Sequence, residues 1–391
     1  MPSRRSARVL VALLAVTAAA CSSSGRTAHP VGTTVTEPAR TATSLPTSLP
    51  QGEAVPARST IRFADVEHGW ASGAGGILAT ADGGATWQLE YPSAAGVGPI
   101  SFLDRRTGWA VEGTTLIATT DGGSSWRRVG AAGALPGPSD LAFVDADRGW
   151  AVVHTRQCSQ GSCEDVGSLL RTLDGGASWS PVGEPGATQA MCWDGQRGWA
   201  GAGTALRTTV DGGERWSPVP TPIAETGEIA DIACAGGAVW VKALHGAAAG
   251  SEGYEVLRSV DARHWDVVLG GLVHQGLPSI DAYSGPLSAR SALSALFVGY
   301  CPACGNQPAA SATRTDDGGR SFQRSPVTSP TDPGFLPAAV SFADHDHGWI
   351  LGTVTTSAGH GGGAVYATVD GGRTWRIVVT SAALAAPAVP R

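Results

Sequence analysis

Cysteines have the clearest capacity for covalent chemistry in this sequence. The chain contains seven, and six remain when Cys21, near the N-terminus, is set aside. An even number of cysteines in an exported chain is typical of disulfide pairing. The predicted pairs are Cys158–Cys163, Cys192–Cys234 and Cys301–Cys304.

Cys301 and Cys304 form a C-P-A-C motif, which two other chemistries use. A redox-active pair needs a helix N-terminus or a positive neighbour that lowers the pKa of its first thiol, and no helix is predicted here. A zinc site needs further ligands, and the sequence contains no second C-x-x-C pair. A structural disulfide is therefore the favoured interpretation.

Other metal-binding patterns are also incomplete. Residues 145–149 and 344–348 both read D-x-D-x-G, like the start of a calcium loop, but the bidentate glutamate of such a loop is missing. His154, His245 and His360 fall in three units of an internal repeat that are not neighbours. We therefore predict neither a bound metal nor a cofactor.

This internal repeat dominates the sequence. Its clearest copy, residues 100–129, ends in T-x-D-G-G-x-S-W, and most copies also carry a Gly-Trp dipeptide in their first half. In the later units, Trp240 and Tyr300 are the weaker counterparts of that dipeptide. The Asp and aromatic residues of the seven copies are Asp82 and Trp87, Asp121 and Trp126, Asp174 and Trp179, Asp211 and Trp216, Asp261 and Trp265, Asp317 and Phe322, and Asp370 and Trp375.

Each unit divides into four short strands, because apolar and polar residues alternate between turn signals. Seven such units predict an all-β protein, a seven-bladed β-propeller over residues 59–381. In the repeated turn, the glycines can take positive φ and the Asp carboxylate can accept backbone N–H groups. We therefore expect the seven Asp residues to be structural rather than catalytic.

The turn resembles the Asp-box, or BNR, repeat of sialidases and related propellers. Together with an F-x-D-x-x-x-G-W-A segment before it, the pattern is similar to the photosystem II stability/assembly factor family. The first unit shows it at Phe63, Asp65, Gly69 and Trp70, followed by the Asp82 turn. Units five and six match poorly. The resemblance implies a propeller fold and a non-enzymatic binding role, and we do not carry over the link to the photosystem, because the motif also occurs in bacterial propellers unrelated to photosynthesis.

The alternative function is an exo-sialidase-like glycoside hydrolase, so the enzyme question stays open. Such an enzyme needs an arginine triad, a Tyr nucleophile and an acid. Tyr283 and Tyr300 are the expected inward tyrosines, but Arg171, Arg258 and Arg314 occupy one repeated position, as strand-surface residues would. The candidate carboxylates are Asp140, Glu164, Asp165, Glu228, Asp231 and Asp281, and no pair among them is singled out.

Insertions between the second and third strands predict where a ligand binds. These loops are long in units three, five, six and seven, at residues 154–167, 244–255, 301–312 and 355–363. They share one predicted face of the propeller, and loops on rigid scaffolds carry function. Neutral variation of surface loops is the competing explanation. The candidate binding residues are His154, Glu164, Asp165, His245, Tyr254, Tyr300 and His360.

The N-terminal segment predicts export. Residues 1–21 combine a basic start, a short apolar stretch and small residues before Cys21, which resembles a bacterial lipoprotein signal. An ordinary signal peptide is the alternative. Residues 22–58 are expected to form a disordered Ser/Thr/Pro-rich tether, and 382–391 a disordered tail.

These features predict that the chain is exported and anchored to the extracytoplasmic side of the cell membrane by a lipid on Cys21. The net charge of −6 and the single lysine exclude a nucleic-acid-binding role. We expect a monomer whose partner is an envelope protein or a glycan.

Overall fold

A computed structural model describes residues 59–384, except 160–161, 183–187, 189, 224, 249–250, 271–272, 275, 302–309, 330–333 and 357–358. All of these residues belong to the unit that runs from Thr43 to Arg391. The predicted signal peptide with Cys21 and the whole of the predicted tether lie outside the described residues. Within the described part, no helix has the length and apolar character needed to cross a bilayer.

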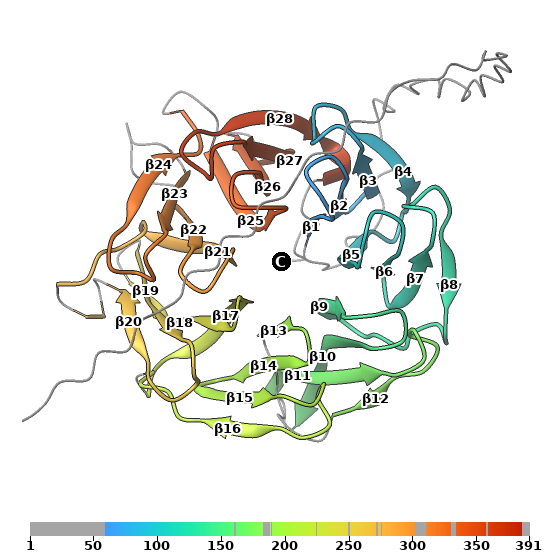
Figure 1. Ribbon diagram of the computed structural model, residues 1–391. Coiled ribbons are helices and arrows are strands. Elements are labelled where there is room, and N and C mark those ends of the chain that lie inside the picture. Colours follow the sequence, from blue (N-terminus) through green and yellow to red (C-terminus); the bar gives the residue numbers. More distant parts are fainter. Residues whose placement is uncertain are drawn as a thin grey trace, which may run out of the picture. The chain divides into compact units, whose positions relative to one another are not determined.

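Seven four-stranded antiparallel sheets form the blades of a β-propeller, which confirms the predicted fold class (Figure 1). Each blade uses four strands that are consecutive in the sequence. Its first strand lies beside the central axis and its fourth at the rim. Blades 1 to 3 comprise β1 (Ile61–Phe63), β2 (Gly69–Gly73), β3 (Gly76–Thr80) and β4 (Gln88–Pro92); β5 (Val97–Phe102), β6 (Gly108–Glu112), β7 (Thr115–Thr119) and β8 (Arg127–Val129); and β9 (Pro138–Phe143), β10 (Gly149–Ser159), β11 (Ser162–Thr172) and β12 (Ser180–Pro181).

Blades 4 to 7 follow the same order. They comprise β13 (Ala190–Asp194), β14 (Arg197–Ala202), β15 (Ala205–Thr209) and β16 (Ser217–Val219); β17 (Glu228–Ala235), β18 (Ala238–Ala248), β19 (Ser251–Ser259) and β20 (Asp266–Leu269); β21 (Tyr283–Ala289), β22 (Ala295–Tyr300), β23 (Ala310–Thr315) and β24 (Gln323–Pro326); and β25 (Gly334–Phe342), β26 (Gly348–Thr356), β27 (Gly359–Thr368) and β28 (Arg376–Ser381).

The antiparallel order gives the propeller two distinct faces. The turns between first and second strands and between third and fourth strands lie on one, which we call the turn face. The hairpins between second and third strands, and the connections to the next blade, lie on the other, the hairpin face. The insertions predicted as loops in blades 3, 5 and 7 are largely β-hairpins, because β10–β11, β18–β19 and β26–β27 extend into them.

Aromatic stacking repeats at the seams between blades. The second-strand Trp of one blade stacks on the first-strand aromatic of the next, as in Trp70–Phe102 and Trp109–Phe143. The indole of Trp70 also donates to the carbonyl oxygen of Gly122, in the Asp-box of the next blade, at 2.9 Å. Blade 6 departs from the pattern, because the register places Leu296, not the predicted Tyr300, at the Trp position.

The ring closes between blades 7 and 1 without strand exchange, since all four strands of each blade are consecutive. Trp349 stacks on Phe63, and its indole donates to the carbonyl oxygen of Gly83 at 3.0 Å. A 3₁₀ turn, η1 (Ala382–Leu384), packs here with Leu384 fully buried. The prediction of a disordered tail from residue 382 is therefore wrong for these three residues, because Leu384 fills the seam. Residues 385–391 lie outside the described residues.

The degenerate Asp-box of blade 5 carries a strained residue. Ala262 takes the place of the first box glycine and has a φ of 58°, the one non-glycine residue with positive φ among those described. An alanine in this region costs about 1–2 kcal/mol, part of which is offset by the greater freedom of glycine in the unfolded chain. Ala262→Gly is therefore expected to raise the free energy of unfolding by about 0.5–1 kcal/mol, measured by urea denaturation.

Gly122→Ala is the reverse control for this prediction. Gly122 has a φ of 78°, and an added Cβ would lie 2.7 Å from the carbonyl oxygen of Arg105. Gly122→Ala is therefore expected to lower the free energy of unfolding. A destabilising Ala262→Gly variant would show that the Ala262 methyl group, which packs on the neighbouring core, outweighs the backbone strain.

Candidate functional site

The Asp-box carboxylates are fully engaged in holding their own turns. Asp121 Oδ1 accepts the Thr119 hydroxyl at 2.8 Å and the backbone N–H of Ser125 at 2.9 Å, and Oδ2 accepts the Ser125 hydroxyl at 2.6 Å. The N–H of Gly122 donates to the carbonyl oxygen of Arg106, which ties the box to the other turn of its blade. Both oxygens of the carboxylate therefore accept hydrogen bonds that hold the turn, which gives Asp121 a structural role.

The same bonds change how these carboxylates titrate. Hydrogen bonds from the Ser125 hydroxyl and backbone, and from Thr119, lower the pKa of Asp121 to about 2. The pKa values of Asp174, Asp211 and Asp370 are also lowered to about 2. Because the folded-state pKa lies below the unfolded value of about 3.9, these boxes stabilise the fold fully above about pH 4. That contribution disappears as the pH falls through the folded-state pKa.

We therefore expect the free energy of unfolding to decrease steeply between about pH 4 and pH 2, measured by urea denaturation at fixed ionic strength. Asp121→Asn should be less stable than the parent protein at neutral pH, and the difference should shrink toward pH 2. A difference that does not depend on pH would show that the ionised form of Asp121 is not what stabilises the turn.

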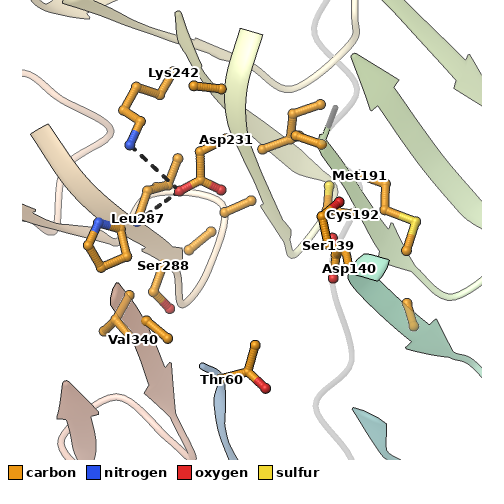
Figure 2. A pocket seen from close by; sticks show the side chains of 18 of the residues that line it. Thr60, Ser139, Asp140, Met191, Cys192, Asp231, Lys242, Leu287, Ser288 and Val340 are labelled. Atoms are coloured by element: carbon orange, nitrogen blue, oxygen red, sulfur yellow. Dashed lines mark hydrogen bonds and ion pairs between the residues drawn. The ribbon is translucent and has the colours of Figure 1, made fainter. Parts of the chain in front are cut away.

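A central cavity of about 610 Å³ lies between the inner strands of six blades (Figure 2). Its walls are built from β1, β9, β13, β17, β21 and β25, with Lys242 and Tyr300 reaching in from second strands. Many of the lining residues are small, such as Ala230, Gly285 and Ala338. A ligand can therefore approach the strand backbones closely.

Lys242, the single lysine of the chain, lies at the wall of this cavity. Its side chain is only 7% exposed, and Nζ donates to the carbonyl oxygen of Gly285 at 2.6 Å. Nζ also lies 3.9 Å from Asp231 Oδ2, which accepts the N–H of Leu287 at 3.1 Å. The pair links blade 5 to blade 6 and places opposite charges beside the cavity (Figure 2).

Asp140 and Ser139 of β9 line another part of the cavity wall, across from Asp231 (Figure 2). Ser139 Oγ lies 3.0 Å from Nε2 of His154, one of the predicted binding residues. The structure thus brings Asp140 and Asp231, two of the six candidate carboxylates, to one cavity. Asp281 Oδ2 instead accepts hydrogen bonds from the Ser311 hydroxyl and the Arg324 guanidinium, each at 2.8 Å.

Two tyrosines form an aromatic pair beside the cavity. Tyr283 and Tyr300 stack with ring centroids 5.2 Å apart, and Tyr300 lines the cavity. Glu252, from the blade 5 hairpin, accepts the N–H and the hydroxyl of Ser284 at 3.0 and 2.7 Å. Burial raises the pKa of Tyr300, and the charge of Glu252 adds to this effect. A raised pKa disfavours the ionised phenol that a Tyr nucleophile needs.

The Cys192–Cys234 disulfide is present and lines the cavity. The strand register places Cys192 opposite Trp199, one position before Trp193, the first-strand aromatic residue of this blade. Cys301 is also disulfide-bonded, and its predicted partner, Cys304, lies outside the described residues. The β10–β11 register places Cys158 opposite Cys163, whose side chains are outside the described set.

The other predicted binding residues do not form one site. Tyr254 is 1% exposed and its hydroxyl oxygen accepts the N–H of Ile280, so it is a core residue rather than a surface ligand. This prediction failed because the insertion continues the sheet, which turns the tyrosine inward. His245 is also buried, against Glu255. The side chains of Glu164, Asp165 and His360 lie outside the described residues.

Sequence reasoning missed a buried acid–imidazole cluster in blade 5. The fully buried carboxylate of Glu255 is bonded by Nε2 of His245 at 2.9 Å and by Nε2 of His274 at 2.6 Å. Thr226 Oγ1 lies 3.2 Å from the other nitrogen of His245. The cluster ties together the connections on the hairpin face, and its only signal in the sequence is a charged residue inside an apolar strand.

The arginines do not converge on the cavity. Arg171, Arg258 and Arg314 belong to three different blades. Arg171 and Arg258 donate to the following blade, at Glu214 and at the carbonyl oxygen of Ala292, and Arg314 donates to Gln323 of its own blade. Among the described lining residues, Arg62 is the one arginine at the cavity. The described residues contain no His, Cys, Asp and Glu cluster that could hold a metal ion.

Comparisons with known proteins agree with this architecture. A family described as "Photosynthesis system II assembly factor YCF48" matches residues 53–155. The solved structure "YCF48 bound to D1 peptide" is 19% identical, with a TM-score of 0.53, over 77% of this chain and 90% of that one. YCF48 from Cyanidioschyzon merolae is 20% identical, with a TM-score of 0.52, over 78% and 94%. The chain is thus a BNR-type propeller that resembles the photosystem II assembly factor.

A glycoside hydrolase is similar in fold as well. The GH74 xyloglucanase from Xanthomonas campestris is 15% identical, with a TM-score of 0.57, over 84% of this chain and 54% of that enzyme. The chain therefore spans about half of that enzyme. The comparison with curated protein sequences finds no match.

Proposed function

We propose that this propeller is a polypeptide-binding protein of the cell envelope, anchored by a lipid on Cys21, which holds a segment of a partner protein in the central cavity. The central cavity carries the proposal. Its volume of about 610 Å³ falls in the range of ligand sites, and small side chains such as Ala230 and Ala338 leave the walls open. The role is that of a binding or assembly factor.

The inner strands supply the chemistry for holding an extended chain. Each is the edge strand of its blade, so backbone N–H and C=O groups on its free side face the axis. Extended peptides bind sheet edges through such groups. Lys242 and Asp231 add one opposite-charge pair, which favours a segment with a polar or charged side chain at that depth. The structural neighbour described as bound to D1 peptide supports a polypeptide as the ligand class.

A hydrolase is the second candidate, because Asp140 and Asp231 line one cavity and a GH74 enzyme shares the fold. Three observations favour binding. Asp231 is tied to Lys242 and the Leu287 amide, Tyr300 has a raised pKa, and the three repeated arginines are held in separate blades. A glycan ligand remains the alternative to a polypeptide.

The test is capture from detergent-solubilised envelope with the full chain as bait, followed by mass spectrometry. Ala338→Arg is the blocking variant, because Ala338 is exposed and lines the cavity. Ala132→Arg is the matched control, since Ala132 is also exposed and is not among the residues that line the cavity. We expect one enriched envelope protein, lost by about tenfold or more with Ala338→Arg alone.

The remaining outcomes separate the alternatives. A partner retained by Ala338→Arg would overturn binding in the cavity. Release of sugar from a sialoside or xyloglucan by the parent protein, abolished in Asp140→Asn, would replace binding with hydrolysis. Cys21→Ser should release the protein from the membrane fraction, and an unchanged distribution would contradict the lipid anchor.

A further inference from the structure

The exposed large apolar side chains are concentrated on one face of the propeller. Among the described residues there are eight, and seven of these lie in turns of the turn face, one in each blade. The eighth, Ile377, lies on the outer strand β28. The seven, which we call the apolar ring, are Val66, Leu103, Leu173, Val210, Val260, Leu293 and Val369.

Folding does not require these side chains. Four of them, including Val210 at 67% and Val369 at 61% exposure, stand between the Thr or Ser and the Asp of an Asp-box. The box bonds run through the hydroxyl, the carboxylate and the backbone, as in Thr209–Asp211, and leave this side chain outside. Single exposed apolar residues are ordinary on a surface. Their restriction to one face, once per blade, favours a contact surface.

Each apolar residue of the ring stands among acidic groups. In the turns of this face, carboxylates outnumber arginines roughly two to one, and there is no lysine. Val66 follows Asp65, Leu173 precedes Asp174, and Val369 precedes Asp370. Several arginines are committed to neighbours, as Arg148 is to Asp145 at 2.6 Å. The turn face therefore combines exposed apolar side chains with an excess of negative charge.

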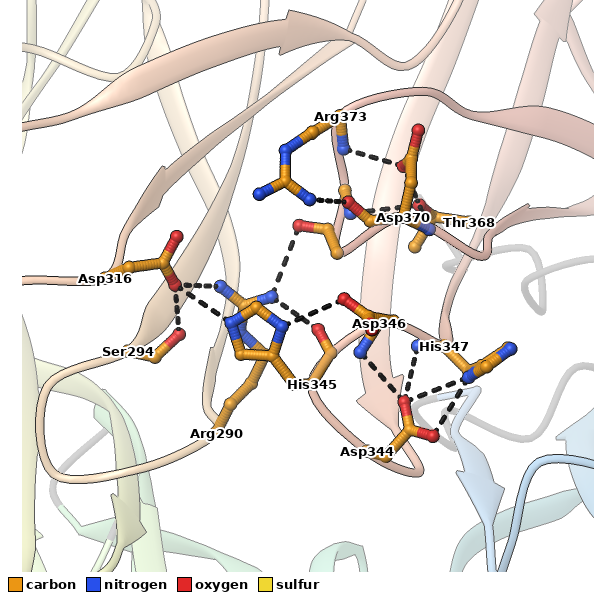
Figure 3. A network of polar contacts seen from close by, with 12 residues as sticks. Arg290, Ser294, Asp316, Asp344, His345, Asp346, His347, Thr368, Asp370 and Arg373 are labelled. Carbon is orange, nitrogen blue, oxygen red and sulfur yellow. Dashed lines mark hydrogen bonds and ion pairs between the residues drawn. The ribbon is translucent and has the colours of Figure 1, made fainter.

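At the seam between blades 6 and 7, an arginine of the turn face is buried and bonded to its neighbours, so its charge is not presented at the surface (Figure 3). The Arg290 side chain is only 2% exposed. Its guanidinium bonds Asp316 at 2.9 Å and the carbonyl oxygens of His345 and Gly371 at 2.9 and 3.2 Å. Arg290 also lies over the ring of Phe342. Arg290 thus supports the seam, whereas Asp316 and Asp346 stay about half exposed.

We infer that the turn face, through its apolar ring, is a docking surface for a basic amphipathic polypeptide segment. Apolar side chains of the partner would contact the ring, and its Lys or Arg residues would face the carboxylates between the ring positions. An anionic membrane surface is repelled by this face, and so is a second copy presenting the same face. The turn face lies at the opposite end of the blades from the hairpin face. This second binding surface is additional to the cavity of the proposed function.

The test compares matched substitutions of exposed residues. The ring variant carries Leu173→Gln, Val210→Thr, Val260→Thr and Val369→Thr, and the control carries Ile377→Thr. Exposed substitutions of this kind change stability little, which urea denaturation checks for both. A second variant, Glu67→Gln with Asp147→Asn, removes two exposed charges of the face, whose side chains make no hydrogen bond or ion pair with any other described residue.

The probes are a labelled synthetic peptide of Leu and Lys at helical spacing and its counterpart with Glu in place of Lys. We expect the parent protein and Ile377→Thr to bind the Leu/Lys peptide equally. The ring variant should bind about tenfold more weakly, and the charge variant should lose part of the salt dependence. Equal binding of the Leu/Glu peptide, or full binding by the ring variant, would overturn the proposal.

Two further measurements complete the test. Binding of the parent protein to phosphatidylglycerol vesicles that is lost in the ring variant would assign the ring to a membrane and overturn the proposal. Ring-dependent self-association in sedimentation experiments would do the same in favour of a second copy.

Discussion

Replacing Trp349 with alanine is expected to lower the free energy of unfolding by about 3–5 kcal/mol. The indole is 2% exposed, stacks on Phe63 of blade 1, and donates to the carbonyl oxygen of Gly83. Truncation removes the stack, leaves a cavity in the seam, and deprives Gly83 of its donor. Urea denaturation followed by far-ultraviolet circular dichroism measures the loss.

Trp349 is expected to have a second effect because of where it lies. The other six seams join blades that follow one another in the chain, whereas blades 7 and 1 are not consecutive and meet through noncovalent contacts. The N–H of Phe63 donates to Ser341 Oγ at 3.2 Å, and Leu384 packs beside the pair. Without Trp349, the ring should open locally at this seam before it unfolds.

Trp109→Ala is the matched control, because Trp109 makes the same contacts within the chain. It stacks on Phe143 and donates to the carbonyl oxygen of Gly175 at 3.2 Å. We expect a similar loss of global stability but no local opening in hydrogen exchange. If Trp109→Ala opened its own seam as readily as Trp349→Ala opens the last one, ring closure would not be the weak point of the fold.

The repeat made the fold predictable because each Asp-box specifies its turn by local bonds. Thr119, Asp121 and Gly123 lie within five residues of one another, so the pattern and the geometry coincide. Register was harder to predict where the repeat decays. Tyr300 was matched to the Trp position, which Leu296 occupies, because blade 6 lacks the Gly-Trp dipeptide that marks the start of the second strand.

The cavity was less predictable than the fold, because its polar groups come from different blades. Lys242 bonds to Gly285, 43 residues away in the next blade, and no local pattern encodes that contact. Lys242 is the only lysine of the chain, which is a usable signal of a specific contact as well as an argument against nucleic-acid binding. The Glu255 cluster depends on His245 and His274, which lie on separate connections. No local sequence pattern predicts that these three side chains meet.

Removing the Cys192–Cys234 disulfide is expected to cost about 4 kcal/mol, from the unfolded-state entropy of a loop with a sequence separation of 42. The disulfide takes the place of a hydrogen bond that two other seams form between the equivalent first-strand positions of neighbouring blades. There, the N–H of Phe143 donates to Ser101 Oγ at 2.9 Å, as the N–H of Phe63 does to Ser341 Oγ. The register places Cys192 and Cys234 at these two positions.

This equivalence sets the control for the disulfide. The variant Cys192→Ser with Cys234→Ala restores the hydroxyl acceptor, whereas Cys192→Ala with Cys234→Ala does not. Both should lose the covalent contribution, and the serine variant should recover about 1 kcal/mol through the restored hydrogen bond. Urea denaturation of the three proteins, with and without reductant, measures both effects. If the two variants were equally stable, the disulfide would not stand in for the hydrogen bond of the repeat. If neither differed from the oxidised parent, the seam between blades 4 and 5 would depend on packing alone.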